Sequence, residues 1–315
     1  MNFQKYFKLL KTPKAFFKQV NLVFKLNYIR LMAHILPDKM YLRCKYRLTF
    51  HRRLHLNNPK LFNEKLQWLK LYDRKPFYHQ MVDKYDAKQF IKEKVGDNYN
   101  IPVIGIYENF EEIDFDNLPD AFVLKATFDS GSYCICNDKS KFDKASAKTK
   151  LLRNWKYDYY IFSREWPYKG LKHRIIAEPL LVDSECPYLR DFKFYCFNGE
   201  PKIFYITSDK GGDLPTKQDF FDIQGNHLEI QDAHYPNNAI KCPDLPKNLN
   251  KMVEMCRVLA KDTYHLRVDF YEINGQIYCG EFTFFEAGGF CKFVPEKYNR
   301  ILGDWIKLPT EKLSL

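Results

Sequence analysis

Residues 266–285 read Leu266-Arg-Val-Asp-Phe-Tyr-Glu-Ile-Asn-Gly-Gln-Ile-Tyr-Cys-Gly-Glu-Phe-Thr-Phe-Phe285, and this stretch decides the fold. Apolar, strand-forming runs lie on both sides of Asn274-Gly275, a dipeptide that is typical of a tight β-hairpin. The sequence therefore predicts antiparallel strands at Leu266 to Glu272 and at Gln276 to Phe285.

The register of this hairpin determines which polar side chains share a face of the sheet. A two-residue turn would pair residue 269 with residue 280 and would place Asp269 and Glu281 on opposite faces. A three-residue loop that ends in a bulge at Gly275 would instead pair 269 with 279 and 267 with 281. We expect the three-residue loop, which places four polar side chains on one face: Arg267, Asp269, Glu281 and Thr283.

Two carboxylates, a guanidinium and a hydroxyl are costly to bury together unless a cation and an anion lie among them. Magnesium held between carboxylates and polyphosphate oxygens meets both conditions. The hairpin alone is slightly better explained by a solvated face with a cross-strand salt bridge. Features in other parts of the chain are needed to choose between a magnesium–nucleotide site and a solvated face.

Several features elsewhere favour a nucleotide site. Lys125 lies in an apolar strand, where its ammonium needs an anion. The turn Asp129-Ser-Gly-Ser132 follows, and its backbone N–H groups could cover phosphate oxygens. Glu178 and a proline interrupt another apolar strand, and Asp191 and Lys193 share one strand face. Each feature taken singly is also compatible with a structural role.

The composition excludes intrinsic disorder, because 45% of the 315 residues are hydrophobic. The net charge of +11 is uneven: residues 1–60 hold 14 basic residues and one acid, or 14 − 1 = +13, and the remainder holds 36 − 38 = −2. We do not expect a nucleic-acid partner, because an enzyme that acts on nucleic acid usually has a basic cleft, whereas the basic surplus here lies in the N-terminal segment. The lysines of residues 1–20 predict either a helix that contacts an anionic membrane or ordinary packing.

The chain shows no apolar stretch of about 18–20 residues and no recognisable secretion signal. Nine cysteines without a CxxC pair fit a reducing cytoplasm, and Cys134-x-Cys136 indicates two core thiols on one sheet face. Helix and strand patterns alternate from about Asp83 onward. We predict an α+β fold, with a helical basic segment at residues 1–80 and a catalytic body at residues 81–315.

The order of these motifs resembles the ATP-grasp superfamily. The motifs are Asp83-Lys84, Leu124-Lys125, Ala177 to Leu181, Asp191-x-Lys193, Arg267-x-Asp269 and Glu281-x-Thr283. Four longer motifs resemble the TupA-like branch, which is named after teichuronopeptide biosynthesis and occurs among surface-polysaccharide genes: Phe62 to Asp73, Ser163 to Tyr168, Phe197 to Gly199 and Gly280 to Phe284. The resemblance covers about residues 35 to 308 and implies two α+β subdomains that clamp ATP.

The resemblance also implies a role for each matching residue. The nucleotide-binding positions are Lys84 and Lys125 at the phosphates, Asp129, Ser130, Gly131 and Ser132 in the covering loop, Glu178 and the Leu181 backbone at adenine, Asp191 at ribose, and Lys193. Asp269 and Glu281 match magnesium ligands, and Arg267 matches the arginine that steadies the transferring phosphoryl group. Thr283 stands where most relatives have asparagine, so it would be a weaker metal ligand.

The implied activity is ligation of a carboxylate to an amine with ATP and magnesium, in the biosynthesis or modification of a cell-surface polysaccharide. The substrates would be small carboxylates and amines or a glycan repeat unit. A metal-dependent glycosyltransferase that uses Asp114-x-Asp116 is an alternative, and a non-catalytic scaffold with a degenerate ATP-grasp fold is another. We expect a cytoplasmic protein that can lie at the inner face of the cell membrane.

Overall fold

The computed structural model describes residues 27–184, 189–208, 215–238 and 242–309. The chain divides into two units, Met1–Leu54 and His55–Leu315. The division therefore falls after Leu54 and not at residue 80, because residues 55–80 make their contacts with the larger unit. The predicted membrane-binding helix at residues 1–20 lies outside the described residues.

The first unit is helical in its described part. Residues 27–35 form a helix, and α3 (Asp38–Phe50) follows it after Pro37. Within α3, Tyr41, Leu42 and Tyr46 are buried, and their spacing of one and four residues places them on one side of the helix.

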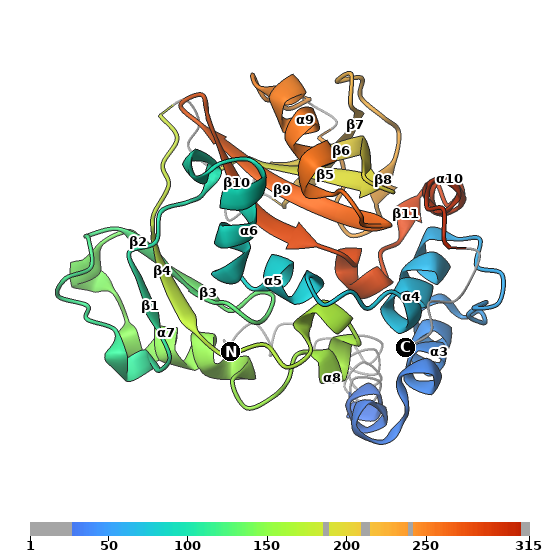
Figure 1. Cartoon of the computed structure of the whole chain (residues 1–315), viewed down its shortest axis with the longest axis horizontal. Helices are drawn as coiled ribbons and strands as arrows, with labels where there is room; N and C mark the ends of the chain where they lie inside the picture. The colour runs from blue at the N-terminus through green and yellow to red at the C-terminus, as the bar shows by residue number, and fades with distance from the viewer. Residues whose placement is uncertain (1–26, 185–188, 209–214, 239–241, 310–315) are drawn as a thin grey trace, which may run out of the picture. The chain divides into compact units, whose positions relative to one another are not determined.

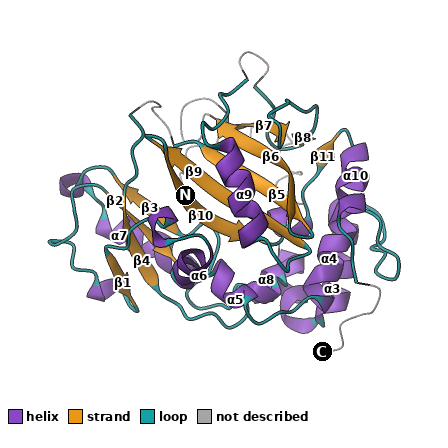
Figure 2. Ribbon diagram, turned by 45° about the horizontal axis from the view of Figure 1, so that its top comes forward, coloured by secondary structure: helices purple, strands orange, loops and turns teal. Residues whose placement is uncertain are grey.

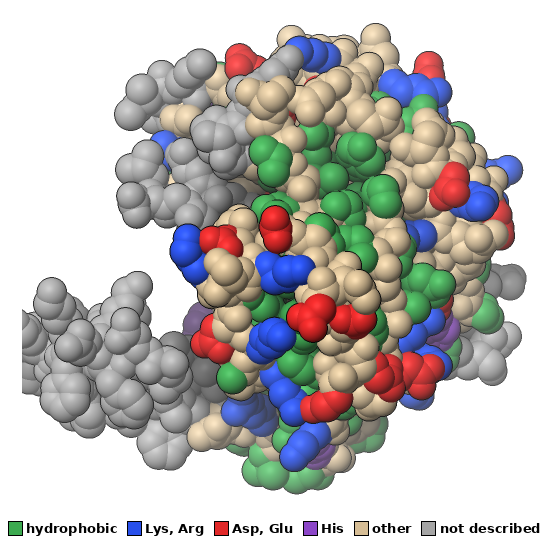
Figure 3. All heavy atoms as spheres, turned by 90° about the vertical axis from the view of Figure 1, so that its left-hand side faces the viewer, with side chains coloured by type: hydrophobic (Ala, Val, Ile, Leu, Met, Phe, Trp, Pro, Cys, Tyr) green, Lys and Arg blue, Asp and Glu red, His purple; other side chains and the backbone are tan. Residues whose placement is uncertain are grey.

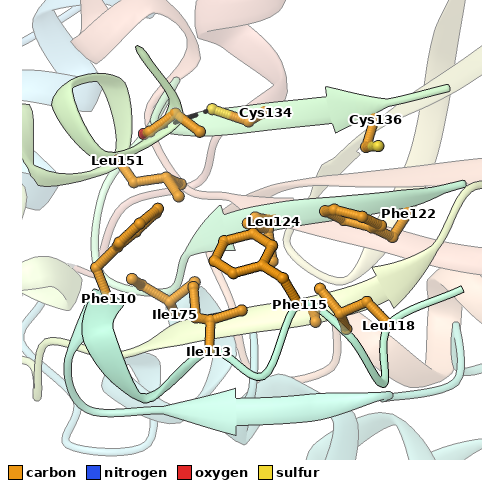
Figure 4. Close-up of a cluster of buried hydrophobic side chains, with 12 residues drawn as sticks. Phe110, Ile113, Phe115, Leu118, Phe122, Leu124, Cys134, Cys136, Leu151 and Ile175 are labelled. Carbon is orange, nitrogen blue, oxygen red and sulfur yellow. Dashed lines mark hydrogen bonds between the residues drawn. The ribbon is translucent and has the colours of Figure 1, made fainter. Parts of the chain in front are cut away.

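The second unit contains a smaller antiparallel sheet in the order β1-β4-β2-β3. Its strands are β1 (Gly105–Tyr107), β2 (Phe122–Ala126), β3 (Tyr133–Cys136) and β4 (Ile175–Pro179). One face carries a hydrophobic cluster that includes Phe122 and Leu124 from β2, Phe115 from the segment between β1 and β2, and Leu151 from α7 (Lys144–Leu151) (Figure 4). Cys134 and Cys136 both belong to this cluster, which confirms them as core thiols.

The opposite face of the small sheet is left partly open. Ile106 and Ile135 are 37% and 50% exposed, and Lys125 and Glu178 occupy neighbouring positions on the same side. Figure 3 views the molecule from the side of this sheet and shows hydrophobic side chains gathered in the middle, with charged side chains around them. Apolar surface beside a few placed charges is typical of a ligand-binding face.

The larger antiparallel sheet has the order β10-β9-β5-β6-β7 (Figure 1). Its strands are β5 (Asp191–Phe197), β6 (Glu200–Ser208), β7 (Lys217–Asp222), β9 (His265–Ile273) and β10 (Gln276–Thr283). Helix α9 (Leu249–Leu259) covers one face (Figure 2), where Phe192, Phe194 and Cys196 alternate with the polar residues of β5. The other face therefore carries Asp191 and Lys193, and strands β9 and β10 add their own polar side chains to it.

The described part of this unit also contains five further α-helices, six short 3-10 helices and one short strand pair. The α-helices are α4 (Phe62–Tyr72), α5 (Tyr78–Val82), α6 (Asp86–Lys94), α8 (Tyr160–Ser163) and α10 (Lys297–Trp305), and the strand pair is β8 (Gln231–Asp232) with β11 (Phe293–Val294). Gly303 of α10 lets that helix approach the start of α4: a Cβ at this position would lie 2.3 Å from the Lys60 carbonyl oxygen. Helix α4 is thus built into the second unit.

Candidate functional site

The hairpin β9–β10 brings the predicted acidic and basic residues onto one face by a different register from the one expected. Asn274 and Gly275 have positive φ angles and form a two-residue turn that pairs Ile273 with Gln276. The predicted three-residue loop is therefore wrong. A bulge at Gly280 shifts the register, so that residue 279 pairs with 270 but Glu281 pairs with Asp269.

The bulge has a clear steric reason. A Cβ at Gly280 would lie 2.7 Å from the ring of Tyr271 and 3.4 Å from the carbonyl oxygen of Asp269, so only glycine fits. A glycine inside a strand often marks a bulge. Because of this shift, Arg267 pairs with Thr283, and the four polar residues share one face as the sequence predicted.

Arg267 is the centre of the site. Its Nε donates to Asp269 Oδ1 (2.6 Å), its Nη2 donates to Asp269 Oδ2 (2.7 Å), and its Nη1 donates to Glu286. Lys193 Nζ donates to the same Asp269 Oδ2 (2.5 Å). Burial raises the pKa of Asp269, but the guanidinium of Arg267 and the ammonium of Lys193 outweigh it and hold this pKa below its usual range.

The ammonium of Lys125 forms an ion pair with a carboxylate of the protein itself. Its Nζ lies 2.5 Å from Glu178 Oε2, and Lys88 Nζ lies 2.6 Å from the other oxygen of the same carboxylate. Burial raises the pKa of Glu178, whereas the two ammonium groups lower it below the ordinary value. Lys88 was not predicted, although its position one helical turn after Lys84 is a signal that could have indicated it.

The loop after β2 is held together by its own residues. Asp129 Oδ2 accepts hydrogen bonds from Ser132 Oγ (2.5 Å) and from Asn154 Nδ2 (2.6 Å), and Lys84 Nζ donates to the Asp129 carbonyl oxygen. Ser130 and Gly131 form the exposed tip, and Gly131 has a φ of 91°. Asp129 and Ser132 therefore stabilise the loop, and the tip is the part that can meet a ligand.

The remaining predicted nucleotide-binding residues, Asp191 and Leu181, lie on different sheets. Asp191 is buried at the start of β5, opposite Thr207, and its Oδ2 lies 3.8 Å from Lys193 Nζ. Leu181 is half-buried just after the end of β4. The predicted residues thus form two groups, one on each sheet, with Asp191 in the large-sheet group and Leu181 in the small-sheet group.

A pocket of about 470 Å³ joins residues from both groups. Its lining combines the loop tip, the hairpin, the segment around α8 and the segment around β8. The lining residues are Ser130, Tyr159, Glu165, Tyr168, Asp232, His234, Tyr235, Arg267, Glu281, Thr283, Phe285, Glu286, Ala287 and Gly288.

Helix α4 supports one wall of this pocket, which the sequence alone did not indicate. Asn63 Nδ2 donates to the Cys291 carbonyl oxygen (2.9 Å), Gln67 Nε2 to that of Gly289 (2.9 Å) and Lys70 Nζ to that of Gly288 (2.7 Å). The three side chains are spaced by four and three residues, which places them on one helix face. They hold the loop that carries Glu286, the unpredicted partner of Arg267.

The oxygen atoms at the hairpin fit a magnesium ion. Glu281 and Thr283 line the pocket, and among the described residues no ion pair or hydrogen bond engages the Glu281 carboxylate. Asp269 lies beside it but is bonded to Arg267. The described ranges contain no cluster of three or more metal-ligating side chains. Magnesium commonly takes one or two carboxylates and completes its octahedron with water and phosphate oxygens, so this donor set suffices.

The alternative metal motif at Asp114 and Asp116 has a structural role. Asp114 Oδ2 accepts a hydrogen bond from Asn117 Nδ2 (2.7 Å), and Asp114 Oδ1 accepts from the Asp116 backbone N–H (3.2 Å). Both acids are exposed and neither lines the pocket. The motif therefore stabilises a turn.

No helix in the described part of the chain has the length and apolar character needed to cross a membrane. This finding concerns the four described ranges alone.

The solved structures that are similar to this chain include several ligases at low sequence identity. D-alanine–D-alanine ligase from Bacillus anthracis, complexed with ATP, is 15% identical with a TM-score of 0.43 over 72% of this chain and 64% of that one. The same ligase from Helicobacter pylori is 14% identical with a TM-score of 0.39 over 74% and 60% of the two chains. The chain thus spans less than two thirds of the length of these ligases.

A third similar structure is the ATP-grasp ligase PsnB complexed with a minimal precursor, which is 11% identical with a TM-score of 0.39 over 77% of this chain and 68% of that one. None of the curated proteins matches the chain. A family profile described as TupA-like ATP-grasp matches residues 64–307. The chain has the α+β ATP-grasp fold and belongs to the TupA-like ATP-grasp family.

Proposed function

We propose that this protein is an ATP- and magnesium-dependent ligase that joins a carboxylate to an amine. Three observations support the proposal: the family, the pocket between the loop tip and the hairpin, and the charges that line it. A fourth observation carries most weight: the bulged hairpin places Glu281 opposite Asp269, and Arg267 lies between Asp269 and Glu286.

In the proposed reaction, a substrate carboxylate receives the terminal phosphoryl group of ATP, and an amine then displaces phosphate to form an amide. Bound magnesium would neutralise charge on the polyphosphate oxygens. Such catalysis needs positioning and charge stabilisation rather than a protein nucleophile. Arg267 would stabilise charge at the reacting oxygens, and its hydrogen bonds to Asp269 and Glu286 fix the plane of its guanidinium.

The small-sheet residues have a second role in this proposal. Lys125, Lys88 and Glu178 form a half-buried group beside the open apolar face, and its two ammonium groups and one carboxylate leave a charge of 2 − 1 = +1. An incoming polyphosphate would share the ammonium groups with Glu178, and the Ser130-Gly131 tip could donate its backbone N–H groups to phosphate. Lys84 stabilises this loop by donating a hydrogen bond to the Asp129 carbonyl oxygen.

Replacing Lys125 with alanine should weaken binding of a non-hydrolysable ATP analogue with magnesium about 10- to 100-fold, since a hydrogen bond to a charged group contributes about 1.5–3 kcal/mol. Isothermal titration calorimetry measures the dissociation constant. Lys172→Ala is the matched control, because Lys172 also pairs with a glutamate, Glu108, but on the exposed surface. Equal affinities of the Lys125 variant and the wild type would refute the role of Lys125.

Titrations with other nucleotides and melting-temperature measurements distinguish the ligase from the two alternative functions. A protein that binds a nucleotide sugar but no ATP analogue would be a glycosyltransferase candidate, although the turn at Asp114 offers no metal site. A protein whose melting temperature responds to no nucleotide would be a scaffold, since a ligand at about 100 times its dissociation constant adds about 2.7 kcal/mol of stability.

We further propose that the ligase acts in cell-surface polysaccharide biosynthesis, on small substrates or a glycan repeat unit and not on nucleic acid.

Residues 1–60 carry the whole basic surplus, and a basic segment gains about 1 kcal/mol per lysine near anionic lipid. The full chain should therefore bind anionic vesicles more tightly than the chain lacking residues 1–20. Co-sedimentation measures this difference, and equal binding would show that the segment does not hold the protein to membrane.

A further inference from the structure

One wall of the pocket has no role in the reaction described so far. It is formed by two segments, residues 159–168 around α8 and residues 232–235 after β8, and we call it the outer wall. Its pocket-lining residues are Tyr159, Glu165, Tyr168, Asp232, His234 and Tyr235. The inner side, formed by the hairpin and the Ser130 tip, is the side assigned to ATP and magnesium.

The pocket is acidic. Its described lining residues include four carboxylates, one guanidinium and one imidazole, which gives 1 − 4 = −3 with the imidazole neutral; the carboxylates are Glu165, Asp232, Glu281 and Glu286. Arg267 already donates to Asp269 and Glu286. Glu281 is assigned to magnesium and Glu286 pairs with Arg267, so the carboxylates that favour a cationic ligand group at the outer wall are Glu165 and Asp232.

Tyr168 gives an independent indication of a ligand. It is only 6% exposed, its side chain lines the pocket, and its hydroxyl has no hydrogen-bond partner among the described residues. Its ring lies 4.9 Å from that of Tyr159. Burial and the nearby charges of Glu281 and Glu165 raise the pKa of Tyr168, so its hydroxyl stays protonated. The hydroxyl is open to the pocket rather than sealed inside the protein, so a ligand that enters the pocket can replace water as its hydrogen-bond partner.

His234 and Asp232 supply the group that amine chemistry needs. Asp232 Oδ1 accepts a hydrogen bond from the His234 backbone N–H (2.7 Å) and lies 3.0 Å from His234 Nδ1. Asp232 Oδ2 accepts from Cys291 Sγ (2.8 Å), which fixes the carboxylate. An ammonium must lose a proton before its nitrogen can attack, and His234 is the imidazole that lines the pocket and can accept it.

We propose that the outer wall binds the amine substrate as an ammonium ion, and that this amine carries no carboxylate of its own. Amino sugars and alkanolamines have this chemistry, whereas α-amino acids do not. The Tyr168 hydroxyl and the acidic lining contact the substrate, and the rings of Tyr159 and Tyr235 cover its apolar part. The inference rests on the proposed ligase function and names the class of its second substrate.

Saturation-transfer NMR on the full chain, with a non-hydrolysable ATP analogue and magnesium present, tests the proposal with matched probes. Ethanolamine is compared with ethylene glycol, and D-glucosamine with D-glucose, since each pair differs by an ammonium in place of a hydroxyl. We expect at least one amine to bind about tenfold more tightly than its neutral partner and than D-alanine. If neither amine exceeds its neutral partner, or if D-alanine binds as tightly, the proposal is wrong.

Tyr168→Phe identifies the place of binding, because it removes only the hydroxyl. We expect amine affinity to fall about tenfold while the melting temperature is kept. Tyr157→Phe is the matched control, since Tyr157 is 48% exposed and does not line the pocket. Unchanged amine affinity in Tyr168→Phe would overturn the assignment. Nucleotide binding is measured on the same samples, so an amine failure with normal nucleotide binding refutes the acceptor site alone.

Discussion

Replacing Arg267 with leucine should lower the free energy of unfolding by about 3–5 kcal/mol, the loss that follows when one member of a buried ion pair is removed. Asp269 is only 2% exposed and has both of its oxygens bonded to this guanidinium. Without it, Lys193 alone faces Asp269, and Glu286 loses its partner. Urea denaturation monitored by circular dichroism measures the change.

The control for this variant is Arg257→Leu. Arg257 also pairs with a carboxylate, that of Glu200, but the two side chains are 46% and 54% exposed. Exposed pairs contribute about 0–1 kcal/mol, so the control should lose little stability. A loss of less than 1 kcal/mol in Arg267→Leu would show that the pair around Asp269 is not a buried network.

The stability that Asp269 contributes through this network should decrease as the pH is lowered. The pKa of Asp269 in the folded protein lies below its value in the unfolded chain, because Arg267 and Lys193 outweigh the effect of burial. The unfolded state therefore binds a proton more readily at low pH. The stability that Asp269 contributes is fully present above its unfolded pKa and is lost as the pH falls through the depressed folded value.

The residues of the hairpin site could be predicted from sequence, because strand parity and charge pattern are local properties. The turn Asn274-Gly275 left two registers to consider, and the criterion of a shared polar face chose the wrong turn length but the right set of residues for the face. The position of the bulge could not be predicted this way. It depends on contact between Gly280 and the ring of Tyr271, which a parity argument does not contain.

The residues that sequence reasoning missed act across long sequence separations. Glu286 meets Arg267 only because the loop after β10 is held by Asn63, Gln67 and Lys70 of α4, more than 200 residues earlier. The helix pattern at residues 62–72 was recognised, but its polar face gave no indication of its partner. This long-range pairing is also the reason that the unit boundary falls at Leu54 rather than at residue 80.

Replacing Glu281 with glutamine should reduce ADP formation about 100- to 1,000-fold, the usual cost of removing one placed group that stabilises charge in a transition state. The fold should be unaffected, because no described residue pairs with the Glu281 carboxylate and glutamine has the same shape. The comparison uses saturating ATP and the carboxylate that gives the highest wild-type rate. Glu254→Gln, on the exposed face of α9, is the control.

A second measurement on the same variant separates metal binding from other roles of Glu281. Wild-type affinity for the ATP analogue should rise on addition of magnesium, because metal bound to Glu281 and to phosphate oxygens links the nucleotide to β10. The glutamine variant should lose most of this rise, since an amide oxygen carries no charge. An unchanged response to magnesium together with normal ADP formation would remove Glu281 from the metal site. Asp269 would then be the acid that lies opposite this position on β9, and its two hydrogen bonds to Arg267 would leave it poorly suited to hold a cation alone.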